Sequence, residues 1–400
     1  MVGVIYLFYN IIIENKGKIF IPFKEYKLLI LFLIWGCLLG LIFMSIDDNI
    51  ELKDFIRDMF YYINPLVYLY IGAMYSKNEI SIYKILNSLI LASGILCFIE
   101  LINVFNSVES IFSSFSVESW RKVSGVGVMT SSIALGIIFS NIIPKENKMS
   151  KMVNIICLII IIIDFIVTLS RTNLLILVIS YLVFAMNLKN VKKILKNMVI
   201  LIVGVIAFVL IISKLLPNQI KEAYIDKLFK SFYEISSNHE WNSLAEIQGN
   251  WRGYETYCAI IQCRKSTLFQ QFFGSGFGKR IYVGNYAYTL LKQTDDNGIP
   301  VTSIAVLHNG YATMLIKQGI LGVILYLTFY CLIIWKGIKS VKKYDNVSSR
   351  ILLVVGLIFL IQTYFLNGLY KDYCFYALLV LLGFASFDID MKIEEENKIE

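Results

Sequence analysis

The chain contains two histidines, His239 and His308, and His308 is the better candidate for acid–base chemistry. It stands at the start of an apolar run, in the sequence His308-Asn-Gly-Tyr311. At a membrane edge, a neutral imidazole can accept a proton from a hydroxyl at physiological pH. The competing interpretation is an interfacial histidine whose ring only hydrogen-bonds a backbone carbonyl. Two histidines also exclude a histidine-rich metal site.

Two arginines are candidates for holding an anion. Arg171 lies in a short hairpin, Leu169-Ser-Arg-Thr172, between two apolar runs. A guanidinium facing lipid costs about 2.5–3.5 kcal/mol at mid-bilayer, so we expect Arg171 to point into the bundle or its outer cavity. There it could grip phosphate with two N–H groups, or it could be an anchor that reaches the interface. Arg252 is equally ambiguous, because Glu255, one helical turn later, could pair with it.

Three more ionisable residues, Glu100, Asp164 and Lys317, lie inside apolar runs. We expect them to pair with one another inside a helix bundle. Asp164 and Arg171 are seven residues apart and would share a helix face. Lys317 is about half a turn out of phase with His308, which predicts that it lines a different surface.

Three further patterns carry little chemistry. The glycine-rich stretch Gly274-Ser-Gly-Phe-Gly278 belongs to no strand–helix unit, so a turn is expected rather than a phosphate loop. Asp295-Asp296-Asn-Gly is also typical of a turn, the alternative being a site for a metal-bound sugar nucleotide. Cys258 and Cys263 match no zinc or redox spacing.

The composition decides which kind of element must position these residues. Of 400 residues, 57% are hydrophobic and 16% charged, beyond the range of soluble domains. Apolar blocks of about 18–22 residues match the length of a membrane-crossing helix. The sequence therefore predicts an all-α, polytopic transmembrane bundle of about eleven spans, the first of them short. The expected spans lie near 2–13, 27–46, 59–75, 84–105, 124–143, 152–169, 173–187, 197–213, 308–335, 351–367 and 373–389.

The net charge of +8 orients the chain rather than indicating nucleic acid. Lysines and arginines concentrate in alternate connections, including 189–196 and 336–343, which predicts that these are cytoplasmic. The long polar segment Lys214–Leu307 is then extracytoplasmic. It should form a helical loop domain, with an amphipathic helix at 218–235 lying on the bilayer interface and a second helix at 243–264. The predicted parts are 1–213, 214–307, 308–390 and a cytoplasmic tail, 391–400.

Over nearly its whole length the chain resembles the O-antigen ligase and Wzy-type O-antigen polymerase superfamily, which assembles bacterial surface polysaccharides. The resemblance rests on the large loop and on the order of short motifs, namely Arg121-Lys-Val-Ser-Gly125, Ser170-Arg-Thr172, Trp251-Arg-Gly-Tyr-Glu255, Gly274-Ser-Gly-Phe-Gly278, and His308-Asn309 with Gly319 and Gly322. The chain departs from the family at Lys317, where members often carry an acid, and in its short first span.

The resemblance implies transfer of glycans linked to undecaprenyl pyrophosphate at the outer face of the bacterial cytoplasmic membrane, without a metal or other cofactor. Arg171 and Arg252 would hold the pyrophosphate and His308 would activate the acceptor hydroxyl. Asn309, Glu255 and Arg280 are candidate supporting residues. Repeat-unit polymerisation in O-antigen or capsule synthesis is favoured, beside a chain-length regulator and a flippase. Ligase-type transfer, a polysaccharide flippase and a structural scaffold remain alternatives.

Overall fold

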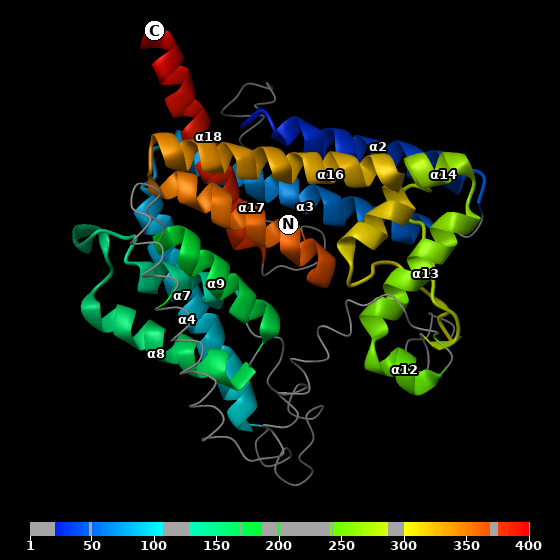
Figure 1. Cartoon of the computed structure of the whole chain (residues 1–400), viewed down its shortest axis with the longest axis horizontal. Coiled ribbons are helices and arrows are strands. Elements are labelled where there is room, and N and C mark those ends of the chain that lie inside the picture. The colour runs from blue at the N-terminus through cyan, green and yellow to red at the C-terminus, as the bar shows by residue number, and fades with distance from the viewer. Residues whose placement is uncertain are drawn as a thin grey trace. The chain divides into compact units, whose positions relative to one another are not determined.

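The computed structural model describes most of the chain, and the described part is mainly helical. The described residues are 21–47, 50–106, 128–168, 170–185, 199, 241, 243–286, 300–368 and 375–399. In chain order their elements are α2 (Tyr26–Met44), α3 (Leu52–Lys77), α4 (Ile82–Asn106), α7 (Met129–Ser140), a short 3₁₀ turn (Lys145–Asn147), α8 (Lys151–Thr168), α9 (Arg171–Ala185), α12 (Leu244–Gly249), α13 (Trp251–Lys265), α14 (Leu268–Phe273), β1 (Ile281–Tyr282), β2 (Ser303–Ile304), α16 (Gly310–Lys343), α17 (Val347–Leu366) and α18 (Tyr376–Ile399) (Figure 1).

Five described helices, α2, α4, α8, α16 and α17, are long and apolar enough to cross a membrane, and α7 and α9 are shorter apolar helices. The prediction of an all-α polytopic membrane protein is therefore confirmed. The expected spans at 2–13 and 197–213 and the amphipathic helix at 218–235 lie outside the described residues.

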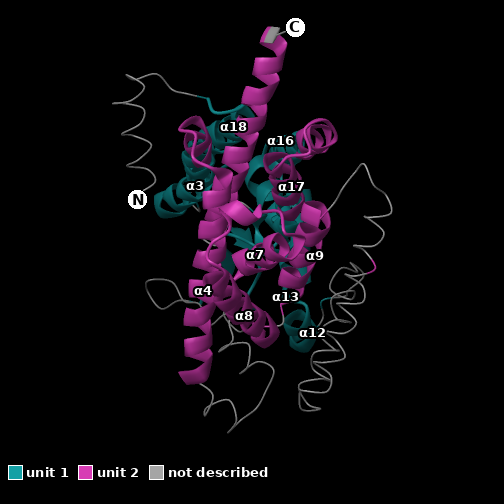
Figure 2. Cartoon of the chain, turned by 90° about the vertical axis from the view of Figure 1, so that its left-hand side faces the viewer, with its two compact units in different colours: residues 1–71, 231–333, 359–373 teal, residues 72–230, 334–358, 374–400 magenta. Residues whose placement is uncertain are grey.

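The chain divides into two compact units (Figure 2). Unit 1 comprises residues 1–71, 231–333 and 359–373, and unit 2 comprises 72–230, 334–358 and 374–400. The described part of the predicted loop domain, 214–307, thus clusters with α2 and with the first parts of α3 and α16.

Unit 2 contains a group of helices packed through small residues. Within it, α7 contacts α9 and α4, and α4 contacts α8. A Cβ at Gly136 of α7 would lie 2.5 Å from the Cβ of Ser180 on α9, so the glycine allows the two backbones to approach closely. Close approach at small residues is a common way for helices to associate where water does not drive packing.

The polar segment of unit 1 differs in detail from the sequence prediction. The single helix expected at 243–264 is two helices, α12 and α13, because Asn250 breaks the run and caps α13. A further short helix, α14, stands between α13 and the glycine-rich stretch. The two-residue strands β1 and β2 pair antiparallel, which joins residues 281–282 to residues 303–304 near the end of the segment.

Helix α16 differs from the predicted span in two ways. Its backbone is broken at Gly319, where φ is 67° and ψ is −170°. In addition, residues 336–343, expected in a connection, form its last turns. Helix α18 likewise continues through most of the predicted tail, and Lys343 pairs with Glu396 there.

Candidate functional site

His308 and Glu255 form a close pair in unit 1. The backbone N–H of His308 donates to Oε2 of Glu255 over 2.9 Å, and the ring Nδ1 lies 2.9 Å from the same oxygen. The Glu255 side chain is 2% exposed, whereas that of His308 is 35% exposed. A carboxylate can only accept, so Nδ1 is assigned the proton and Nε2 is left with its lone pair. This is the arrangement in which a neutral imidazole acts as a base.

Helix α13 positions Glu255 through its N-terminal cap and a small apolar core. The Asn250 side chain accepts the N–H of Gly253 over 3.0 Å, and a Cβ at position 253 would lie 2.7 Å from that amide. Tyr254 packs in a core with Ile281 and Leu307, and its hydroxyl donates to the Val283 carbonyl over 3.2 Å. Burial raises the pKa of the Tyr254 phenol, which keeps this donor protonated.

Asn309 ties the start of α16 to α13. Its side-chain oxygen accepts the N–H of Ala312 over 3.3 Å, as an N-cap does, and its Nδ2 donates to Thr256 Oγ1 over 3.3 Å. The Asn367 N–H donates to the His308 carbonyl over 2.8 Å. The backbone on both sides of the imidazole is therefore fixed, and a supporting role of Asn309 remains a prediction.

The two candidate pyrophosphate-binding arginines belong to different units. Arg252 is in the first turn of α13, three residues before Glu255, and is partly exposed. Arg171 is the first residue of α9 in unit 2 and is also partly exposed. Their joint grip on pyrophosphate remains a prediction.

Arg280 is held by partners that the sequence did not reveal. Its Nη1 donates to Asp54 Oδ2 over 3.0 Å, and its Nε and Nη2 donate to the side chain and carbonyl of Ser303, both over 2.9 Å. Asp54 also pairs with Arg57 at 2.6 Å and is 3% exposed. Asp54 lies before the predicted start of its span and 226 positions from Arg280, which is why no local pattern indicated the contact.

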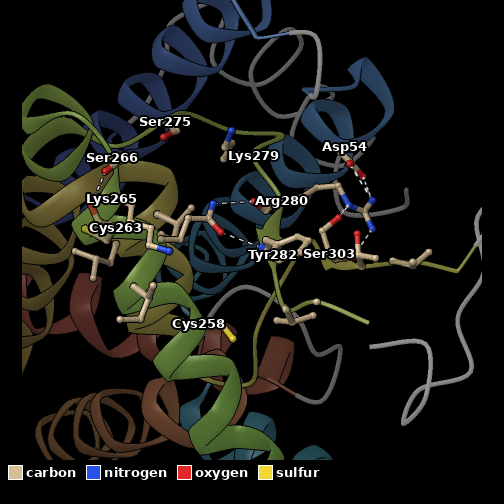
Figure 3. Close-up of a pocket in the computed structure, with 18 of the residues that line it drawn as sticks. Asp54, Cys258, Cys263, Lys265, Ser266, Ser275, Lys279, Arg280, Tyr282 and Ser303 are labelled. Atoms are coloured by element: carbon tan, nitrogen blue, oxygen red, sulfur yellow. Dashed lines mark hydrogen bonds and ion pairs between the residues drawn. The ribbon is translucent and has the colours of Figure 1, made fainter. Parts of the chain in front are cut away.

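Arg280 lines a polar cleft of about 1260 Å³ in unit 1 (Figure 3). One wall is α13, and the others come from the start of α3, the glycine-rich stretch and the β1–β2 region. Gln262 joins two of these walls, because its amide donates to the Arg280 carbonyl over 3.1 Å and accepts the Tyr282 N–H over 2.9 Å. Cys258 and Cys263 also line the cleft as free thiols, and burial raises the pKa of both.

The glycine-rich stretch and Lys317 form a second polar cluster. Lys317 and Asp58 are an ion pair with both side chains 1% exposed, and Asp58 also accepts the Gly278 N–H over 2.7 Å. The expectation that Lys317 pairs with Glu100 or Asp164 is therefore wrong. Sequence reasoning missed Asp58 because it placed the start of that span at residue 59, whereas α3 begins at Leu52.

The expected turn at 274–278 is confirmed. It packs against the break in α16 and hydrogen-bonds to carbonyls there. Gly274, Gly276 and Gly278 all have positive φ. The N–H groups of Ser275 and Gly276 donate to the carbonyls of Ile316 and Lys317, over 3.0 and 2.7 Å. These carbonyls lie just before Gly319, where the helix cannot supply their usual partners.

No group of three or more histidine, cysteine or acidic side chains suited to a metal occurs among the described residues. Asp295 and Asp296 lie outside them.

Comparison with known proteins gives one family match. Residues 156–327 match the model of a family described as O-antigen ligase. The matched segment includes Arg171, Arg252, Glu255, Arg280 and His308. No curated protein matches the chain. The family match agrees with the resemblance to the O-antigen ligase and Wzy-type superfamily, and the apolar helices indicate a multi-pass membrane protein.

Proposed function

We propose, on the premise of this O-antigen ligase-type domain, that the protein joins lipid-linked glycan repeat units at the outer face of the cytoplasmic membrane. The donor and acceptor would be oligosaccharides carried on undecaprenyl pyrophosphate, and the polymer would serve as O-antigen or capsule. The large segment 214–307 would face outward and the C-terminus would be cytoplasmic.

The observation that carries the proposal is the His308–Glu255 pair. A carboxylate that is 2% exposed holds both the ring Nδ1 and the backbone N–H of a histidine that is 35% exposed. Glu255 fixes the ring orientation and would stabilise the imidazolium formed when Nε2 takes a proton. A transporter or scaffold has no need of a base oriented in this way.

The proposed step is a single displacement at the anomeric carbon of the donor sugar. The acceptor hydroxyl loses its proton to His308 Nε2 while its oxygen forms the new glycosidic bond. The bond from the anomeric carbon to the pyrophosphate oxygen breaks, and its electron pair leaves with the pyrophosphate. Arg171 and Arg252 would neutralise the charge that grows on this leaving group. The arginines supply the cationic role, so we propose that no metal is needed.

The test uses a strain in which the gene is deleted and replaced by single variants. In His308→Ala and Arg171→Lys strains we expect single lipid-linked units on the outer leaflet and no long chains. Loss of a positioned base costs about 10²–10⁴ in rate, and lysine cannot reproduce a bidentate contact with phosphate. The matched control is His239→Ala, which changes the other histidine of the chain. The measurement is the length and leaflet distribution of the lipid-linked glycans.

Two outcomes would contradict the proposal. Normal polymer length in a well-expressed His308→Ala strain would remove the catalytic role, while units retained on the inner leaflet would favour a flippase.

Ligase-type transfer is the second candidate, because the matching family is itself described as O-antigen ligase. Purified protein given only lipid-linked repeat units separates the two. A polymerase lengthens the glycans under these conditions, whereas a ligase leaves them unchanged until a different acceptor is added.

A further inference from the structure

The cleft beside α13 is too large for a small ligand. Its volume of about 1260 Å³ exceeds the roughly 300–1,000 Å³ of most small-molecule pockets. Tyr254, Cys258, Gln262 and Lys265 all line it from one face of α13. The distance along the helix from Tyr254 to Lys265 is about 16 Å, at ~1.5 Å per residue. A groove of this length suits an extended chain of several sugar rings.

The cleft and the proposed catalytic pair share helix α13. Tyr254, which lines the cleft, directly precedes Glu255, which holds His308. Adjacent residues on a helix face different directions, and neither Glu255 nor His308 is among the described residues that line the cleft. The cleft is therefore a site on the same helix as the pair but apart from the reacting atoms.

The charge of the cleft favours an anionic ligand. It is lined by five cations, Lys53, Arg57, Lys265, Lys279 and Arg280. Among the described residues its lining holds two acids, Glu51 and Asp54, and Asp54 is already shared by Arg57 and Arg280. Lys279 pairs at 2.6 Å with Asp47, which is not part of the lining, so cations still outnumber the acids. A cleft with one prevailing sign of charge concentrates ligands of the opposite sign.

The cleft also carries aromatic surface suited to sugars. Tyr282 on β1 and Tyr257 on α13 are 62% and 44% exposed, although large rings are usually buried. Tyrosine offers an apolar face with a polar tip, which matches a sugar ring with its C–H faces and hydroxyl edges.

We propose that this cleft binds the glycan part of the substrate and selects glycans whose sugars bear anionic groups, such as the carboxylate of a uronic acid. The inference rests on the proposed function for its biological setting, but the binding itself does not require catalysis. The lipid carrier's pyrophosphate is a second source of anionic charge, and the experiment must distinguish the two.

The test measures binding of soluble oligosaccharides to the purified full-length protein in lipid nanodiscs. The probes are an oligogalacturonide of defined length and the same oligosaccharide with its carboxylates reduced to hydroxymethyl groups. We expect the acidic probe to bind at least about tenfold more tightly than the neutral one, and less tightly as salt rises, because exposed charges are screened.

Variants locate the binding site. Lys265→Gln and Tyr282→Ala should each weaken binding of the acidic probe by about three- to tenfold, the scale of one exposed charge or ring contact. Arg264→Gln is the matched control, since it removes a cation from the next position on α13 that does not line the cleft. Tyr282→Phe should retain binding because it keeps the ring.

The remaining arms identify the source of the anion and separate this inference from the proposed function. His308→Ala should bind the acidic probe normally, so loss of activity and loss of binding can be told apart. Equal affinity for the acidic and neutral probes, or no binding of either, would overturn the selection for anionic glycans. Displacement of the acidic probe by inorganic pyrophosphate would also overturn this selection if Lys265→Gln weakened the displacement. That result would assign the cleft to the pyrophosphate of the lipid carrier.

Discussion

A single buried carboxylate organises the residues proposed to carry out the reaction. Glu255 contacts the ring and the backbone of His308 at once, so the orientation of the imidazole follows from the placement of α13. Removing the charge of Glu255 without changing its shape tests whether this orientation matters.

Glu255→Gln should lower the rate of glycan elongation by about 10²–10⁴. The glutamine oxygen can still accept both N–H groups of His308, but the neutral amide no longer stabilises the imidazolium that forms when Nε2 takes a proton. The measurement is the initial rate with purified protein and a lipid-linked repeat unit. Glu246→Gln on α12 is the control and should change the rate only slightly. A rate close to wild type in Glu255→Gln would assign the carboxylate a packing role alone.

At this scale the sequence indicated His308, and it included Glu255 and Asn309 as candidate supporting residues. It could not indicate the ion-pair partners of Arg280 and Lys317. Asp54 and Asp58 lie at the start of α3, more than 200 residues from those cations, and local spacing carries no information about such distant contacts.

Helix α16 is the element whose irregularity shapes unit 1. Its break at Gly319 leaves carbonyls that the turn at 274–278 satisfies, and the Asp58–Lys317 pair holds both in place. The sequence predicted the apolar span because length and hydropathy are local properties. It did not predict the break, because glycine is tolerated within helices. The hydrogen bonds missing at the break are supplied by a segment from elsewhere in the same chain, which local sequence does not reveal.

The Asp58–Lys317 pair predicts strongly non-additive stability. Asp58→Asn alone leaves Lys317 as a buried unpaired cation and should destabilise the protein by about 3–5 kcal/mol. Lys317→Met should cost less, because Asp58 keeps Arg57 at 3.6 Å and the Gly278 N–H. The double variant removes both charges and should recover much of that loss. Thermal unfolding in detergent measures the cycle. Lys343→Gln breaks an exposed pair with Glu396 and should have little effect. Additive losses in the double variant would contradict the pairing.

Two glycines with similar, positive φ predict different tolerance to a side chain. Gly276 has φ of 81° and a Cβ there would lie 2.1 Å from the Gly40 backbone nitrogen, so Gly276→Ala should abolish the folded protein. Gly284 has φ of 67°, but its nearest contact is 4.0 Å away. Gly284→Ala should therefore cost only about 1–2 kcal/mol of backbone strain. The measurement is the yield of monodisperse protein for each of the two variants. Equal yields would exclude close packing of the turn on α2.

On the scale of the whole molecule, the sequence predicted the class and most described spans because a bilayer imposes a strict length and polarity on each helix. The division into two compact units was not predicted. It depends on contacts between segments far apart in the chain, and residues 231–333 cluster with the first helices.

The proposed orientation predicts which cysteines react from outside. In a cysteine-free variant, Ser243→Cys should be labelled by an impermeant maleimide on intact cells, and Lys342→Cys only after permeabilisation. Both positions are exposed. Native Cys258 and Cys263 should react more slowly than Ser243→Cys at neutral pH, because their raised pKa lowers the thiolate fraction, and faster as pH rises. The reverse labelling pattern would invert the topology.

Metal independence is a prediction for the complete reaction. Elongation by purified protein should be unchanged after exhaustive chelation, because in the proposed reaction Arg171 and Arg252 would supply positive charge to the leaving pyrophosphate. The control uses the same chelator saturated with Mg²⁺. Activity that disappears on chelation and returns with Mg²⁺ or Mn²⁺ would require a metal site and would direct mutagenesis to Asp295 and Asp296.

The distance along the chain between Asp58 and Lys317 has a consequence for biosynthesis. Their hydrogen bond joins residues 259 positions apart. At the usual 5–20 residues per second, the ribosome takes about 10–50 s to make the intervening chain. Throughout that interval Asp58 of the newly inserted α3 lacks Lys317 and has Arg57, 3.6 Å away in the folded protein, as its one cationic partner on that helix. The hydrogen bonds between the break in α16 and the turn at 274–278 can form only after the residues of α16 have been made. Unit 1 therefore completes its packing late, when its first helices are already in the membrane.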